Sequence, residues 1–258
     1  MPRWDSVQYL RFERERAVPC VDLVRRIELE SPRRIVDLGC GPGTSARILR
    51  ARWPGASVLG VDSSGEMLRG ARAALPDVEW AEADLATWTP GRRFELVFSN
   101  AALQWLPDHP HLLPRLWSMV ATDGALAFQV PAPGSARRTW SEPLDQVLAL
   151  PAWRARLTSR AAVESVLPAD AYYDLLSPSA RRVDLWDTEY LHVLSGPEAV
   201  VEWTKGTALR PLLEQLPVES EQQAFLADYR RALTPRYPRR PDGRVLFPFL
   251  RRFVIAYR

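Results

Sequence analysis

A glycine-rich segment that follows an acidic residue is the part of the sequence best suited to bind a ligand. Residues 36–43 read VDLGCGPG, in which Asp37 precedes the glycines. Glycine lets the backbone turn sharply and come close to a bound molecule. Thr44 replaces the third glycine of a dinucleotide-binding GxGxxG pattern, which disfavours a nicotinamide oxidoreductase. The ligand-binding residues predicted on this turn are Asp37, Gly39, Cys40 and Gly41.

Polar residues also follow the next three apolar runs of the sequence. Asp62 stands roughly 20 residues after the glycines, where an acid can accept hydrogen bonds from both ribose hydroxyls of an adenosine. Asp84 is expected to accept a hydrogen bond from the adenine amino group, and Leu85 to cover the adenine ring. The ligand-binding residues predicted beyond the glycine turn are Asp62, Ser63, Met67, Asp84, Leu85 and Asn100.

Alternating strands and helices are predicted to position these residues. Apolar runs predict strands over 34–39, 57–62, 78–84, 94–100 and 125–130. Amphipathic patterns predict helices over 7–27, 44–53, 65–75 and 111–120. This alternation is typical of a parallel sheet covered on both faces, where ligands bind beyond the carboxyl ends of the strands. The glycine turn, Asp62, Asp84 and Asn100 all occupy such strand ends.

The pattern changes after residue 130. Two more strands are predicted, over 182–194 and 245–257. Helices are predicted near Leu144, near Ala161, over 197–216 and over 221–237. A capping box of Ser220 and Gln223 is expected to begin the last helix. We therefore expect an α/β fold with a doubly wound, seven-stranded, mostly parallel sheet that ends in an antiparallel pair. The expected organisation is a helical cap (1–30), a cofactor-binding core (31–135), and helical lid insertions with the last two strands (136–258).

Composition excludes several other classes of protein. The 258 residues carry a net charge of +3, from 34 basic and 31 acidic residues spread along the chain, so no nucleic-acid partner is expected. No apolar run reaches the roughly 18 residues that a membrane span needs, and residues 1–12 lack a signal-peptide core, so we expect a cytoplasmic protein without a membrane partner. Cys20, Cys40 and the three histidines lack metal-site spacing, so no metal is expected. The sequence predicts no oligomeric state.

Longer motifs resemble a known family. Residues 35–130 are similar to class I S-adenosylmethionine-dependent methyltransferases through VDLGCGPG, GVDSS, EADL and FSNAALQWL. Almost the whole chain resembles the trans-aconitate 2-methyltransferase family. The motifs that carry this resemblance are Trp4, Tyr9-Leu10, NAALQWLPD (100–108), YYD (172–174), WTKGTALRP (203–211) and the segment 249–258. Departures from the family pattern occur at Ala132-Pro133 and at Asp170-Ala171.

The resemblance implies a Rossmann-like fold, S-adenosylmethionine as cofactor and a tricarboxylate, trans-aconitate, as the substrate that becomes a monomethyl ester. A carboxylate is already ionised at neutral pH, so no general base is needed, and Gln104 and Trp105 are expected to position the reactants. The other carboxylates need cationic partners, for which Arg210 and Arg251 are predicted, with Arg252 as an alternative to Arg251. The predicted substrate-binding residues are Trp4, Tyr9, Gln104, Trp105, Tyr172, Tyr173, Arg210 and Arg251. His109 and His111 are expected on a helix surface.

Alternative functions stay open at this point. One is methyl transfer to another small organic acid, a phenol or a natural product, and another is a non-catalytic binding protein of the same fold. DNA amine methyltransferases are disfavoured, because Ala101-Ala102 stands where that class has an Asn/Asp-Pro-Pro-aromatic motif.

Overall fold

A computed structural model describes residues 12–132, 140–157 and 165–258. Seven strands form one sheet in the order β3-β2-β1-β4-β5-β7-β6. The strands are β1 (Arg34–Leu38), β2 (Ser57–Asp62), β3 (Glu79–Glu82), β4 (Phe94–Asn100), β5 (Val120–Pro131), β6 (Arg182–Leu194) and β7 (Val245–Tyr257). Strands β1 to β5 pair in parallel, whereas β7 is antiparallel to both β5 and β6. The doubly wound, mostly parallel sheet predicted from the sequence is confirmed, and its order reverses between β1 and β4.

Helices cover both faces of this sheet. The helices of the core are α2 (Glu13–Arg26), α3 (Thr44–Arg52), α4 (Gly65–Ala74), α5 (His109–Ser118) and α7 (Ala169–Leu176). An apolar cluster that contains Cys20 and Leu23 joins α2 and α3 to one face. A second cluster, which contains Leu113 and Tyr172, joins α5 and α7 to the other face. Because both faces are covered, the strands between them carry continuous apolar runs.

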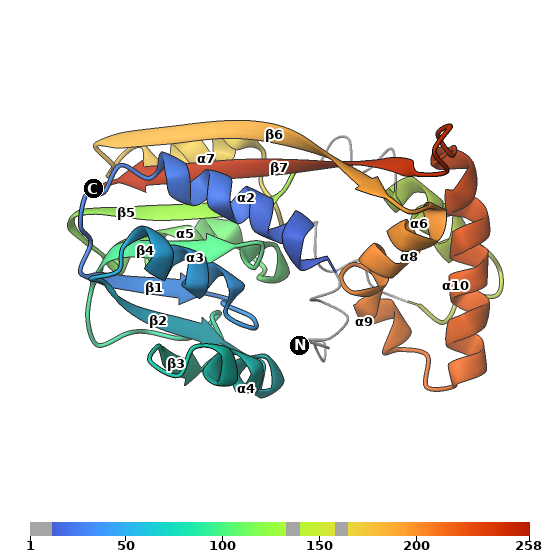
Figure 1. Ribbon diagram of the computed structural model, residues 1–258, viewed down its shortest axis with the longest axis horizontal. Coiled ribbons are helices and arrows are strands. Elements are labelled where there is room, and N and C mark those ends of the chain that lie inside the picture. The colour runs from blue at the N-terminus through green and yellow to red at the C-terminus, as the bar shows by residue number, and fades with distance from the viewer. Residues whose placement is uncertain (1–11, 133–139, 158–164) are drawn as a thin grey trace.

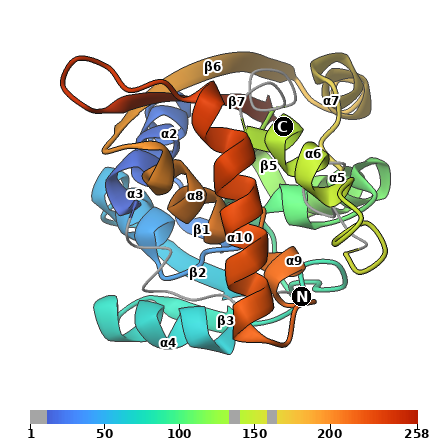
Figure 2. The ribbon, with the colours of Figure 1, turned by 90° about the vertical axis from the view of Figure 1, so that its right-hand side faces the viewer.

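A separate group of helices lies beyond one end of the sheet (Figures 1 and 2). These helices, which we call the lid, are α6 (Glu142–Leu148), α8 (Pro197–Lys205), α9 (Arg210–Leu213) and α10 (Glu219–Leu233). Strands β6 and β7 pair along 13 residues, but β5 pairs only with residues 251–257 of β7. The remaining half of this pair extends past the core and carries the lid, whose helices bury an apolar cluster of their own.

Several boundaries differ from those predicted. The helix expected over 197–216 ends at Lys205, and α9 begins at Arg210, because Gly206 and Pro211 interrupt the helical pattern. The expected capping box is wrong: Val218 precedes α10, and no side chain caps its first turn. The helix expected near Ala161 lies outside the described residues. No described helix is long and apolar enough to cross a membrane.

Candidate functional site

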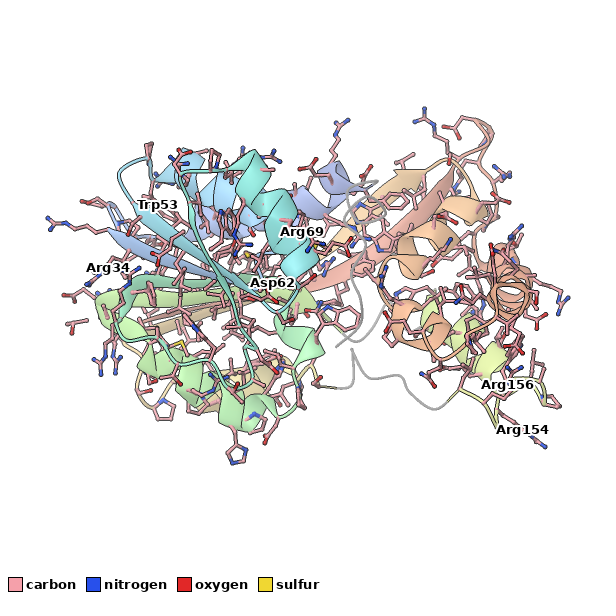
Figure 3. The ribbon with its side chains drawn as sticks, turned by 90° about the horizontal axis from the view of Figure 1, so that it is seen from below. Arg34, Trp53, Asp62, Arg69, Arg154 and Arg156 are labelled. Atoms are coloured by element: carbon pink, nitrogen blue, oxygen red, sulfur yellow. The ribbon has the colours of Figure 1, made fainter. Side chains whose placement is uncertain are left out.

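A cavity of about 310 Å³ lies between the carboxyl ends of the parallel strands and the lid. Asp62 lies at the end of the core that faces the lid, whereas Arg34 lies at the opposite end (Figure 3). The sequence-predicted residues that line the cavity are Gly39, Gly41, Asp62, Ser63, Met67, Leu85, Asn100, Gln104, Trp105 and Arg251. Cys40 lines a smaller recess beside the glycine turn. The switch in strand order therefore places most of the predicted residues together, as expected for an open α/β sheet.

The glycine turn between β1 and α3 needs its glycines for two different reasons. Gly39 has a φ of +71°, and a Cβ there would lie 2.2 Å from the Cβ of Ala102. Gly41 has a φ of +53°, but a Cβ there would meet nothing within 4 Å. The open space beside Gly41 belongs to the cavity. Gly39 thus permits close packing inside the protein, and Gly41 leaves room for a ligand against the backbone.

Asp62 connects the glycine turn to the end of β2. Its Oδ2 accepts a hydrogen bond from the backbone N–H of Gly41 at 2.9 Å, and its Oδ1 accepts one from Ser64 at 2.9 Å. Burial raises the pKa of Asp62, and these backbone N–H donors oppose the rise. The backbone N–H of Ser63 is a third such donor. The acceptor capacity that remains on the Asp62 carboxylate is available to hydroxyl groups in the cavity.

Asp37 lies beneath the glycine turn and is fully buried. Its Oδ2 accepts a hydrogen bond from the Ser45 hydroxyl at 2.5 Å, whereas its Oδ1 has no hydrogen-bond partner among the described residues. Burial raises the pKa of Asp37 to about 7; the Ser45 hydroxyl opposes this rise, and the nearby Asp62 adds to it. Asp37 therefore links the glycine turn to α3 through Ser45 and does not line the cavity.

The raised pKa of Asp37 predicts a pH-dependent stability. The folded chain binds this proton more tightly than the unfolded chain does, so the free energy of unfolding should fall as pH rises from about 4 to about 7. The fall attributable to Asp37 is at most about 4 kcal/mol. Chemical denaturation of the ligand-free chain at several pH values measures it. Asp37→Asn, which can still accept from Ser45, should flatten this part of the profile, and an equally steep profile in that variant would contradict the assignment.

The segment after β4 forms one wall of the cavity under backbone strain. Ala101 has a φ of +54°, which is unfavourable for a residue with a Cβ. Two hydrogen bonds hold it: its N–H donates to the carbonyl of Gln129 at 3.0 Å, and its carbonyl accepts from Nε2 of Gln104 at 2.7 Å. Gln129 also donates to Oδ1 of Asn100 at 2.6 Å. Strained residues often mark functional sites, because the surrounding structure must stabilise them.

Leu85 and Asp84 behave differently, although both follow β3. Leu85 is buried and lines the cavity, whereas Asp84 is exposed and accepts from the N–H of Ala86 at 2.8 Å. Arg115 of α5 holds this loop in place by donating to the carbonyls of Leu85 and Trp88. Leu85 thus lines the cavity whereas the carboxylate of Asp84 does not, and the adenine contacts expected of both residues stay predictions.

The three candidate arginines occupy three different environments. Arg251 lines the cavity, and its guanidinium carbon lies 4.3 Å from the centre of the Phe249 ring. Arg252 does not line the cavity and pairs with Asp187 on β6, at 2.8 Å and 2.9 Å. Arg210 does not line the cavity either, and its Nε lies 3.6 Å from Glu214 one helical turn away. Arg251 is therefore the candidate arginine that lines the cavity, and the substrate contacts expected of Arg251 and Arg210 stay predictions.

Comparisons with known proteins agree with this geometry. A methyltransferase domain model matches residues 12–177. The trans-aconitate 2-methyltransferase of Azoarcus sp. (strain BH72) is 48% identical over 260 aligned residues, which cover 100% of both chains. The protein of that name from Escherichia coli O157:H7 (strain EC4115 / EHEC) is 42% identical and is matched over 99% of its length. The chain belongs to the trans-aconitate 2-methyltransferase family.

More distant solved structures share the fold of this methyltransferase. The YcgJ protein from Bacillus subtilis aligns with a TM-score of 0.61 at 12% identity, over 93% of this chain and 98% of that one. A Haemonchus contortus phosphoethanolamine N-methyltransferase 2, solved in complex with S-adenosyl-L-methionine, aligns with a TM-score of 0.56 at 16% identity, over 92% of this chain and 52% of that one. These likenesses confirm the Rossmann-like methyltransferase fold.

The structure places the predicted tyrosine pair away from the cavity. Tyr172 is fully buried on the face of the sheet that α5 and α7 cover, where its hydroxyl lies 2.7 Å from Nδ1 of His109. Tyr173 is 50% exposed and does not line the cavity. Neither tyrosine lines the cavity, and their binding of substrate stays a prediction. His109 is also buried rather than on the surface, whereas His111 is exposed as predicted.

The cavity also contains residues that the sequence analysis did not predict. Trp4 and Tyr9 lie outside the described residues. Arg16, Trp203 and Phe249 line the cavity of this methyltransferase but were not predicted to bind. The sequence does carry a signal for Arg16, because it is the one charged residue on the buried stripe of α2, which contains Arg16, Pro19, Cys20, Leu23 and Val24. Trp203 belongs to the apolar cluster of the lid and also lines the cavity, which depends on how the lid packs.

Proposed function

We propose that this methyltransferase moves a methyl group from S-adenosylmethionine to a carboxylate oxygen of trans-aconitate and forms a monomethyl ester. The observation that carries the proposal is the charge arrangement of one cavity. Asp62 supplies a carboxylate at the end formed by β1 and β2, and Arg251 supplies a cation at the end formed by β7 and the lid. This arrangement suits a neutral nucleoside at the first end and a polyanionic acid at the second.

The described residues fit S-adenosylmethionine at the first end of the cavity. Asp62 would accept hydrogen bonds from the two ribose hydroxyls, and Met67 and Leu85 offer apolar contacts for the adenine ring. The open space at Gly41 allows the chain of the cofactor to pass close to the backbone. When bound, the cofactor supplies a methyl group on a positively charged sulfur.

The residues of the second end would hold the acid and exclude water. The attacking carboxylate is ionised at neutral pH, so the enzyme need not remove a proton from it. Gln104 holds the strained Ala101 in place, and with Trp105 it forms a fixed wall against which the acid can be oriented. Such orientation replaces general-base catalysis as the main source of rate acceleration. Arg251 can bind one of the carboxylates that do not react, since its planar guanidinium offers parallel N–H donors.

A labelled-methyl assay tests this proposal. Purified enzyme with radiolabelled S-adenosylmethionine should transfer label to trans-aconitate, with much lower kcat/KM for cis-aconitate, citrate and isocitrate. An acid panel that includes other small dicarboxylates and phenols would reveal a different preference. Transfer to another acceptor but not to trans-aconitate would contradict the substrate assignment and leave the methyltransferase assignment intact.

Gly41→Val provides a test of the cofactor site. A branched side chain would fill the space beside the backbone and would be strained at a φ of +53°. We expect S-adenosylhomocysteine binding to be lost in a chain that still folds. Gly243→Val is the matched control, because Gly243 also has a positive φ (+80°) and open space, but does not line the cavity. Equal cofactor affinity in both variants would show that the turn does not hold the cofactor.

We also propose that the enzyme works in the cytoplasm. Cys20 and Cys40 are both free and buried, which is typical of a protein kept in a reducing compartment. Fractionation of cells that express the chain with an epitope tag would test the location, and recovery outside the cytoplasmic fraction would contradict it.

A further inference from the structure

Helix α2 carries a positive charge into the cavity. Arg16 lies on the buried stripe of this helix, is 9% exposed, and lines the main cavity. It also lines the smaller recess beside Gly41 and Asn100, so it lies where the glycine turn meets the lid. In Figure 1 the N-terminal end of α2 is directed toward the lid helices.

An aromatic side chain of the lid orients this arginine. The guanidinium carbon of Arg16 lies 4.8 Å from the centre of the Trp203 ring. The indole can stabilise the cation through its π electrons and covers one side of the guanidinium group. All five N–H donors of a guanidinium lie in its plane, in a fork that matches the two oxygens of a carboxylate.

The charges around this position favour an anion. Arg251 lines the same cavity, and both arginines act on His192, which stacks on Trp203 at 4.8 Å. Burial first, then Arg251 and Arg16, lower the pKa of His192 to about 4, so this histidine is neutral at pH 7 and adds no charge. Glu13 lines the recess, but its carboxylate already pairs with Arg47 and accepts from the Thr44 hydroxyl at 3.3 Å.

We propose that Arg16 binds a carboxylate group inside the cavity. This inference rests on the proposed function, because both proposed ligands carry carboxylates. The main cavity would hold a carboxylate of the acid between Arg16 and Arg251. The recess beside the glycine turn would instead hold the carboxylate on the methionine part of the cofactor. The chemistry at Arg16 is the same in both cases, and the two sources are separable by experiment.

Two variants of Arg16 and one control carry the test. Arg16→Gln removes the charge and the fork, whereas Arg16→Lys keeps a charge and most of the stem that covers Trp203. Arg14→Gln is the matched control, because Arg14 lies on the same helix, is exposed and does not line the cavity. Thermal unfolding of all three shows whether each chain folds.

The measurements are the Kd of S-adenosylhomocysteine by calorimetry and the KM for trans-aconitate at saturating cofactor. Arg16→Gln should raise the Kd, the KM or both by about tenfold or more. Arg16→Lys should recover part of this loss, and Arg14→Gln should leave both values unchanged. A change in the Kd assigns the carboxylate of the cofactor, and a change in the KM assigns that of the acid. If Arg16→Gln does not fold, Arg16→Lys alone still tests the inference, because lysine lacks the planar fork of donors and should raise the Kd or the KM.

The inference is overturned if folded Arg16 variants keep both values within about twofold of the wild type. A wild-type chain that is inactive toward trans-aconitate would contradict the proposed function separately. In that case calorimetric titration of the variants with S-adenosylhomocysteine and with trans-aconitate still decides whether Arg16 binds a carboxylate.

Discussion

Arg251→Ala is expected to raise the KM for trans-aconitate by the equivalent of about 2–5 kcal/mol, because it would leave a buried carboxylate without its cation. Arg251 is 6% exposed and lies over Phe249 at the lid end of the cavity, so water cannot easily replace it. The affinity for S-adenosylhomocysteine should stay close to that of the wild type, since Asp62 and the glycine turn lie at the other end. Steady-state kinetics with the acid, and calorimetry with the cofactor product, measure the two effects.

Two further variants make this result specific. Arg210→Ala removes an arginine of the lid that pairs with Glu214 and does not line the cavity, so its KM should be near that of the wild type. Arg251→Lys should recover only part of the loss, because lysine cannot make the bidentate fork. If Arg251→Ala and Arg210→Ala have the same KM as the wild type, the acid binds elsewhere in the protein. Parallel loss of cofactor and acid binding would instead indicate a damaged fold.

Asp62→Ala is expected to weaken cofactor binding by about 1.5–3 kcal/mol for each charged hydrogen bond lost. The change also removes the acceptor that holds the N–H of Gly41, so the glycine turn itself should loosen. Calorimetry with S-adenosylhomocysteine measures the loss directly. The KM for the acid, measured at saturating cofactor, should change much less.

Asp62→Asn and Asp77→Ala complete this series. Asp62→Asn keeps one acceptor oxygen and removes the charge, so its affinity for S-adenosylhomocysteine should lie between those of the wild type and Asp62→Ala. Asp77 pairs with Arg50 on the exposed surface, and its removal should leave cofactor affinity unchanged. Unaltered affinity in a folded Asp62→Ala chain would exclude Asp62 from the cofactor site.

Local sequence patterns were sufficient to predict the sheet. Strands β2, β4, β6 and β7 have the bounds that were predicted from the sequence. The grouping of the glycine turn with Asp62 in one cavity followed from the same reasoning, since the carboxyl ends of parallel strands meet at one edge. This is why Gly41 and Asp62 were predicted together although they are 21 residues apart.

The substrate end could not be predicted in the same way, because it depends on packing between distant segments. Arg251 and Arg252 are neighbours on β7, and strand alternation sends them to opposite sides, but only the pairing of Arg252 with Asp187 shows which one faces the cavity. Tyr172 belongs to a motif shared with the family, yet α7 packs on a face of the sheet and buries this side chain away from the cavity. The position of Arg16 in the cavity could not be predicted without knowing where the lid lies relative to α2.

Product analysis after a single turnover tests the central claim most directly. Excess enzyme would be mixed with S-adenosylmethionine carrying ¹³C in its methyl group and with trans-aconitate, and the product examined by carbon NMR and mass spectrometry. The account predicts one labelled methyl ester per acid molecule, at one carboxyl position, and a much slower reaction in Arg251→Ala. A product with no ester methyl, or with methyl groups distributed among all the carboxyls, would contradict a single cavity that fixes one carboxylate against the methyl donor.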